Sequence, residues 1–390
     1  MVAVTDNQTV DTGRVDKFDL TRFIFLRAVA LVYVIAFASL LVQIIGLIGH
    51  DGILPAERFL PNLKQALLLS DGGSYGGNPY LICPTIFWLA VNDPLLTGTC
   101  VAGIITGLLA LSGVTMRADF VILWILYRSL IAVGGDFLSF QWDILLLETG
   151  FLCIFWADGA LLDAPWPRSA ATKQPAEMKS ASHIVLWLLR LLLFKLMFLS
   201  GLVKLKSEDP TWWNLTALDY HYWTQPLPTP LAWYAAQFPQ WWQKLSTGIM
   251  FFIEIVVPFM IFGPRLFRRL AAIPLVGLQL LIATTGNYTF FNFLTMSLCL
   301  TLLDDDLLAR ALPKSLVIAI QERCRLFSTS FKWNRISELS LAALIGTLNL
   351  YCLVPAVAAI PPVALLVSTL QPLELVNRYG LFASMTTTRH

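Results

Sequence analysis

The sequence predicts an all-α fold, a polytopic bundle of about eight or nine transmembrane helices, each needing roughly 20 apolar residues. Two observations support this prediction. Hydrophobic residues make up 57% of the 390 residues and charged residues only 13%, whereas a soluble domain carries about 25% charged residues. The mean hydropathy is +0.68, and long apolar runs recur along the chain. The lipid bilayer is therefore the expected surroundings of most of the chain.

The charge and the reactive side chains exclude several classes of protein. A net charge of +2 is too balanced for a nucleic-acid-binding protein, and the basic residues do not form one patch. The six cysteines include no C-x-x-C pair, and the four histidines show no ligand spacing. We therefore expect no metal, no cofactor and no nucleic-acid partner, and most cysteines are interpreted as buried small hydrophobic residues.

Nine apolar segments are candidates for membrane spans. The segment before the first one is polar and is interpreted as an ordinary N-terminal segment, because it has no cleavage site for a signal peptide. The eighth candidate is short and is either a span or a buried half-helix. Three prolines follow the last candidate span: Pro361, Pro362 and Pro372. The candidates are residues 24–49, 95–114, 120–134, 142–156, 184–205, 246–262, 270–285, 290–303 and 339–360.

The Lys and Arg residues of the short loops indicate the orientation. If the N-terminus is cytoplasmic, most of these basic residues lie on the cytoplasmic side of the membrane. They include Arg117 and the clusters at 265–269 and 310–335. A weak amphipathic helix at 312–327 is expected on the inner membrane surface. The expected regions are a cytoplasmic segment 1–22, a transmembrane core 23–304 containing an outside loop 206–244, a basic cytoplasmic loop 305–335, a last transmembrane region 336–370 and an outside tail 371–390.

Two outside loops are long. The loop at 50–80 contains Gly72-Gly73-Ser74-Tyr75-Gly76, which matches the G-x-S-x-G pattern of serine hydrolases. That motif requires a strand before it and a helix after it, and a membrane helix precedes it here. We therefore interpret this segment as a flexible loop.

The loop at 206–244 is rich in Trp and Tyr. Such rings suit the headgroup layer, where the ring face is buried and the polar edge stays wet. They could also form an apolar platform for a partly folded client protein. The candidate client-surface residues are Trp212, Trp213, Tyr220, Tyr222, Trp223 and Trp233.

Charged residues within the spans are costly unless they are paired or hydrated. Acids on one span and bases on the next predict interhelical ion pairs, with Asp143 or Glu148 paired to Lys195 or Arg190. Glu254 is expected to pair with one of the same two bases. Either the pairs fix the register of the helices or they line a functional polar cavity.

Further polar residues complete the set of candidates. Amides at membrane depth are expected to form interhelical hydrogen bonds, and Asp219 and His221 could act as a general acid or base. A lone His among aromatic residues is more often structural. The candidate functional polar residues are Asp143, Glu148, Arg190, Lys195, Lys204, Asp219, His221, Gln225, Glu254, Asn287 and Asn292, and no residue is assigned as catalytic.

Several sequence blocks resemble the lipase maturation factor family. They lie at 140–152 (FQWDILLLETGFL), at 194–212, at 254–258 and at 285–292. The most specific is Asp219-Tyr220-His221-Tyr222-Trp223-Thr224-Gln225-Pro226-Leu227-Pro228-Thr229-Pro230, and Tyr379-Gly380-Leu381-Phe382 fits the same pattern.

The resemblance implies a polytopic membrane protein that assists folding and assembly of secreted dimeric lipases. It implies the endoplasmic reticulum membrane in a eukaryote, and the inner membrane is expected in a bacterium. The family has no established catalytic residues to transfer. Animal members continue into a sizeable soluble domain, and this sequence ends at His390. We therefore expect a membrane core that lacks most of that domain.

Three functions remain open. The leading hypothesis is a non-enzymatic factor that assists maturation of an exported client such as a lipase. The alternative is a membrane enzyme in which Asp143, Lys195, His221 and Glu254 converge on one cavity. A transporter is ranked last, because the inverted repeats typical of transporters are not evident. The sequence does not predict the oligomeric state.

Overall fold

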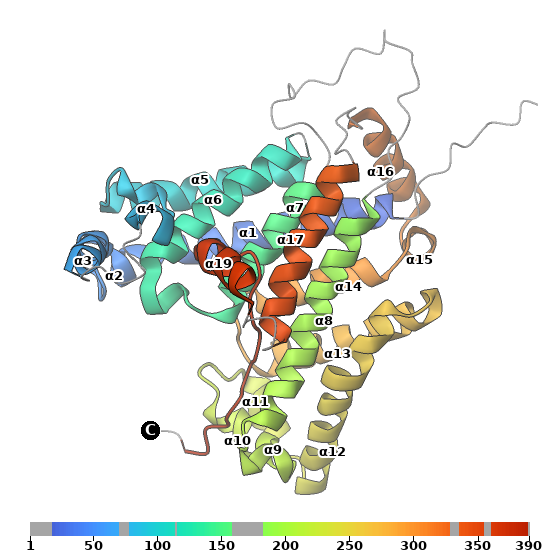
Figure 1. The fold of residues 1–390 in the computed structure, drawn as a ribbon. Coiled ribbons are helices and arrows are strands. Elements are labelled where there is room, and N and C mark those ends of the chain that lie inside the picture. The colour runs from blue at the N-terminus through green and yellow to red at the C-terminus, as the bar shows by residue number, and fades with distance from the viewer. Residues whose placement is uncertain are drawn as a thin grey trace, which may run out of the picture.

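The computed structural model describes residues 18–69, 78–113, 115–157, 182–327, 335–354 and 360–388. These residues form helices and connecting segments with one isolated β-bridge and no β-strand. Seven helices in this part of the chain are long and apolar enough to cross a membrane: Asp19–Leu41, Asp93–Ser112, Met116–Leu138, His183–Lys206, Gln240–Phe262, Arg265–Thr285 and Ile336–Leu353. The all-α polytopic membrane fold is therefore confirmed (Figure 1).

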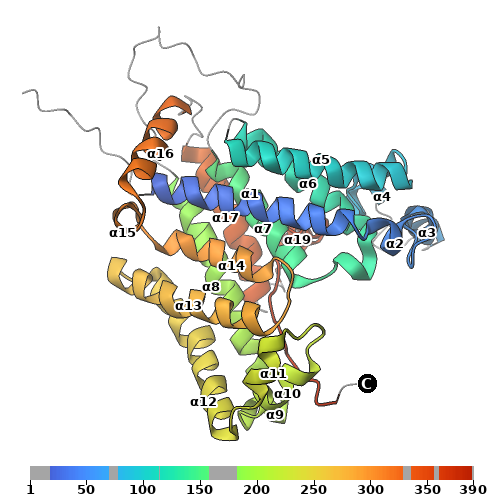
Figure 2. The same ribbon diagram turned by 180° about the vertical axis from the view of Figure 1, so that it is seen from behind.

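Four helices form the N-terminal half of the core: α1 (Asp19–Leu41), α5 (Asp93–Ser112), α6 (Met116–Gly134) and α7 (Gln141–Trp156). In both views α1, α5 and α6 run side by side (Figures 1 and 2). Gly150 lets α7 approach α1, because a Cβ there would lie 1.9 Å from the Tyr33 hydroxyl. That hydroxyl donates to the Leu146 carbonyl at 3.2 Å.

Short elements connect these helices. They are α2 (Ile44–Ile48), α3 (Ala56–Leu69), α4 (Pro79–Ile82), η1 (Ile86–Trp88) and η2 (Gly135–Leu138). The predicted first span is thus a long helix followed by a separate short one. The loop expected at 50–80 contains helix α3, whereas its G-x-S-x-G segment lies outside the described residues.

Helix α8 (His183–Lys206) is the centre of the C-terminal half. It packs against α7, α14 (Phe291–Cys299), α17 (Arg335–Leu353) and the helical segments η3 (Phe252–Val256) and η4 (Val257–Phe262). These two segments continue α12 (Gln240–Phe251), and α13 (Arg265–Thr285) follows them. The short segment predicted at 290–303 is α14 with η5 (Leu300–Leu302).

Short helices replace the irregular loop expected at 206–244. They are α9 (Pro210–Trp213), α10 (Ala217–Thr224) and α11 (Pro230–Ala236), and we call them, with the first turn of α12, the aromatic lobe. The Asp209 side chain caps α9 by accepting from the Thr211 N–H at 2.8 Å. Proline begins both α9 and α11, a position that does not need an N–H donor.

The opposite end of the molecule gathers the segments predicted to be cytoplasmic. Helix α15 (Asp305–Ala311) and helix α16 (Lys314–Phe327) lie beside the start of α1 (Figure 2). Val317 and Ile320 of α16 are buried with Leu20. The amphipathic helix therefore exists as predicted, and part of its apolar face packs on the protein. Its placement on the inner membrane surface stays a prediction.

The chain after α17 does not form a simple tail. Helix α19 (Pro361–Leu370) begins at a proline, and η6 (Gln371–Leu373) follows. Residues 374–388, which we call the C-terminal strap, then run from α19 to the aromatic lobe (Figure 1). Sequence patterns predicted neither α19 nor the path of the strap.

Candidate functional site

The first buried ion pair joins the two central helices. Lys195 Nζ on α8 lies 2.6 Å from Glu148 Oε1 on α7, and these side chains are 0% and 3% exposed. One of the predicted pairings is therefore present. The other oxygen, Oε2, accepts from the Tyr379 hydroxyl at 2.7 Å and from the Asn377 N–H at 3.1 Å. The carboxylate thus has three donors, which compensates its removal from water.

The second buried ion pair differs from the prediction. Glu254 pairs with Lys204, at 2.7 and 2.9 Å, and not with Lys195 or Arg190. Glu254 lies in the π-helical segment η3, because Pro258, four residues later, offers no N–H to continue an α-helix. Gly201 permits the close contact of α8 with this segment, since a Cβ there would lie 2.7 Å from the Ile255 side chain.

The C-terminal strap connects the pair of Glu148 and Lys195 to the aromatic lobe. The Tyr379 ring lies over Lys195 Nζ, with 5.2 Å between the nitrogen and the ring centroid. Three residues later the Phe382 carbonyl accepts from Trp212 Nε1 at 3.1 Å, and the Met385 N–H donates to Asp209 at 2.6 Å. The Tyr-Gly-Leu-Phe motif therefore lies at the point where core and lobe meet.

A hydrogen-bond network fixes the base of the lobe. Gln225 Nε2 donates to the Thr285 carbonyl at 2.8 Å, and its Oε1 accepts from the Tyr288 hydroxyl at 3.0 Å. The same hydroxyl lies 3.5 Å from His221 Nε2. Burial, with a smaller contribution from the Lys204 charge, lowers the pKa of His221 to about 4. His221 is therefore neutral at pH 7 and is suited to a structural role.

The candidate client-surface residues divide into two groups. Trp212 is 2% exposed and is not on the surface, because its indole N–H is bound to the strap and its ring covers Lys204. Tyr222 is half-buried. The other four are exposed: Trp213 (62%), Tyr220 (37%), Trp223 (44%) and Trp233 (53%).

The remaining predicted polar residues lie apart. Asp143 accepts from the Tyr127 hydroxyl at 2.6 Å and pairs with neither predicted base. Arg190 donates to the Thr301 carbonyl at 2.8 and 3.0 Å. Asn292 donates to Gln279 at 2.8 Å, as expected for an interhelical amide. Asn287 accepts from the N–H two residues on, at 3.1 Å, and Asp219 is half-exposed on α10.

These positions do not form one cavity. Lys195 and Lys204 are nine residues apart on one helix, which separates the two ion pairs by roughly 13 Å along the helix axis. Asp143 and His221 belong to neither pair. In the described ranges, no three His, Cys, Asp or Glu residues are placed to hold a metal ion. The four residues of the enzyme hypothesis are therefore held in separate sets of contacts.

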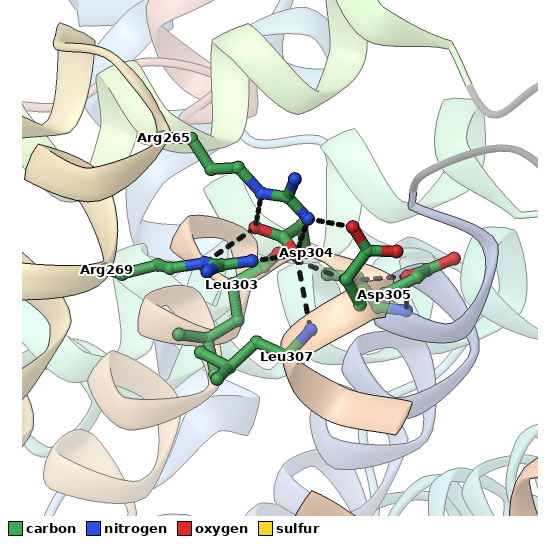
Figure 3. Close-up of polar contacts among 8 residues, drawn as sticks. Arg265, Arg269, Leu303, Asp304, Asp305 and Leu307 are labelled. Carbon is green, nitrogen blue, oxygen red and sulfur yellow. Dashed lines mark hydrogen bonds and ion pairs between the residues drawn. The ribbon is translucent and has the colours of Figure 1, made fainter. Parts of the chain in front are cut away.

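A third charged cluster was missed by sequence reasoning. Arg265 and Arg269 on α13 hold Asp304 with contacts of 2.6–2.9 Å (Figure 3). Burial alone would raise the pKa of Asp304, but these contacts and the Leu307 N–H hold that pKa well below its ordinary value. The neighbouring Asp305 caps the start of α1 by accepting from the Leu20 and Thr21 N–H groups. The available signal was the run of three Asp residues after a short span.

Comparisons with known proteins agree with this architecture. Residues 20–310 match the family described as the lipase maturation factor transmembrane domain. Lipase maturation factor 2 of Xenopus laevis is 44% identical over 74% of this chain and 40% of its own length. Its human counterpart is 44% identical over 74% of this chain and 41% of its own length. Lipase maturation factor 1 of Bos taurus is 33% identical over 96% of this chain and 66% of its own length.

The chain thus spans about 40% of the length of the lipase maturation factor 2 proteins that it matches. No solved structure matches it. The match to the transmembrane domain covers most of the helical core, including α1, α8 and the aromatic lobe. The chain is an integral membrane protein that belongs to the lipase maturation factor family.

Proposed function

We propose that this protein is a membrane-embedded maturation factor that assists folding or assembly of exported proteins, with lipases as the client class. The single observation that carries the proposal is the aromatic lobe, where large apolar rings stay exposed on helices that are firmly anchored to the core. Trp213, Trp223 and Trp233 would contact apolar client surface before the client buries it.

The anchoring supports this role. A lobe that only lies in the headgroup layer does not need buried contacts with the core. Here the side chains of Trp212, Gln225 and Asp209 are all hydrogen-bonded to the strap or to the end of α13. A rigid presentation lowers the entropy that is lost when a client binds. The client class is taken from the related proteins, which are named lipase maturation factors.

The proposal places the lobe on the exoplasmic side and the N-terminus in the cytoplasm. The Lys and Arg bias supports that orientation, and so does the separation of α15 and α16 from the lobe helices α9, α10 and α11 (Figure 2). In a eukaryote this side is the lumen of the endoplasmic reticulum. Cleavage of the lobe in sealed vesicles by a protease added to the cytosolic side would contradict this orientation.

The test is restoration of lipase activity in cells that lack the endogenous factor. We expect the wild-type chain to restore secreted lipase activity, and W213A/W223A/W233A to lower it at least about tenfold while lipase mRNA is unchanged. The matched control is F252A/F267A/F293A, which removes three rings of similar exposure (55%, 50% and 52%) from apolar helices outside the lobe. Equal activity of the two triple variants would refute the lobe as the client surface.

A further inference from the structure

A cavity of about 360 Å³ lies between α17, α19 and the start of the C-terminal strap. Leu348, Val367 and Leu370 supply its apolar wall, and Cys352, Asn377 and Arg378 supply polar groups. Its volume falls at the lower end of the roughly 300–1,000 Å³ that is typical of small-molecule sites. The maturation role proposed above does not use this cavity.

The cation at the cavity is available to an external anion. Arg378 is exposed, and in the described part of the chain no carboxylate lies within ion-pair distance of it. The carboxylate of Glu148, which accepts from strap residues on either side of Arg378, is already held by Lys195, Tyr379 and the Asn377 N–H. The strap thus donates hydrogen bonds to the buried Glu148 carboxylate and leaves the Arg378 guanidinium at a cavity with one apolar wall.

We propose that this cavity binds a fatty acid, with the carboxylate on Arg378 and the acyl chain against Leu348, Val367 and Leu370. Guanidinium and carboxylate form paired charge-assisted hydrogen bonds, and the apolar wall gains from covering methylene groups. At about 30 Å³ for a group the size of a water molecule, the cavity holds roughly a dozen heavy atoms. That capacity fits one acyl chain better than the two chains of a phospholipid.

The site is distinct from general contact with membrane lipid. A lipid that merely covers the protein surface contacts all exposed apolar residues and does not depend on one cation. A ligand in this cavity contacts α17 and α19 and responds to Arg378. It also borders strap residue Asn377, whose N–H donates to Glu148.

The test is photocrosslinking of the full chain in detergent with a photoactivatable analogue of decanoate, a fatty acid whose length matches the capacity of the cavity. We expect the crosslinks to fall on peptides of α17 and α19. Unlabelled decanoate should compete, and methyl decanoate, which lacks the charge, should not. Equal competition by the methyl ester, or labelling spread evenly over all membrane-spanning helices, would overturn the proposal.

Variants then separate the cation from the cavity. R378Q should reduce crosslinking at α17 and α19 about tenfold, and R378K should reduce it less, because Lys keeps the charge without the planar fork. K206Q is the matched control, since Lys206 is an exposed cation outside the cavity, and should leave labelling unchanged. V367W should abolish labelling by filling the cavity with Arg378 still present. Unchanged labelling in R378Q and V367W, each eluting as a folded monodisperse species, would refute the site.

Discussion

The pair of Glu148 and Lys195 shows how a charged residue is kept within a membrane helix. Both side chains are buried, both oxygens of the Glu148 carboxylate accept hydrogen bonds, and Lys195 contacts that carboxylate and the Tyr379 ring. Breaking such a pair leaves one charge uncompensated, which costs about 3–5 kcal/mol, whereas replacing both charges with apolar groups is often tolerated. The pair therefore contributes more to the specificity of packing than to net stability.

E148L and K195M as single changes should each lower the stability of the folded protein by about 3–5 kcal/mol. The double variant E148L/K195M should regain much of that loss, because it leaves no buried charge. Thermal unfolding in detergent measures both effects, with K206M as an exposed control. A double variant as unstable as the sum of the single variants would contradict the account.

His221 gives the aromatic lobe a dependence on pH. Its pKa is about 4 in the folded protein, below the ordinary value of 6.5, mainly because of burial. Between these two values the unfolded chain binds a proton that the folded chain does not, so stability falls as pH drops from about 6.5 to about 4 and the loss is complete below that. The shift corresponds to about 3 kcal/mol at most.

H221Q should therefore weaken the acid sensitivity of the lobe. We expect the melting temperature of the wild-type protein to fall more steeply than that of H221Q between pH 6.5 and 4. Carboxylates that titrate in this range affect both proteins equally, so the difference between the two pH profiles reports the titration of His221. Parallel pH profiles would show that His221 does not sense pH.

At the scale of elements, the C-terminal strap holds the lobe on the core. Tyr379 and Phe382 contact Lys195, Glu148, Trp212 and His221, which come from four different helices. Y379F removes the hydroxyl that donates to Glu148, at an expected cost of about 1–3 kcal/mol. Hydrogen exchange should then become faster at strap residues 377–385 and at α9.

If Y379F left exchange at the strap unchanged, or accelerated it as much in α5 as in α9, the strap would not couple core and lobe. Y351F is a suitable control, because this hydroxyl belongs to α17 and lies outside the contact with Glu148.

Sequence patterns predicted the spans because hydropathy over about 20 residues is a local property. They also predicted that Glu148 pairs with a base of the next span, because acids and bases lie on consecutive spans. They predicted the wrong ion-pair partner for Glu254, because the direction of its side chain depends on the π-helical turn that Pro258 causes. They failed for Trp212 and the strap as well. Contacts between residues 170 positions apart, such as Trp212 and Phe382, leave no periodic signal.

At the scale of the whole molecule, the two ends differ in chemistry. One end gathers Arg265, Arg269 and Asp304 with the start of α1, and the other end carries the aromatic lobe (Figure 2). The membrane core between them matches the transmembrane domain of the lipase maturation factors. The account therefore assigns anchoring to the core and client contact to the lobe.

Site-specific photocrosslinking to a newly made lipase tests this assignment most directly. A photoreactive amino acid would replace Trp213, Trp223 or Trp233 in turn, and Phe267 on α13 as the control position. From this assignment we expect crosslinks to the lipase from the three lobe positions while the lipase is folding, and none from position 267. Crosslinks that are absent from the lobe, or equally strong from position 267, would contradict it.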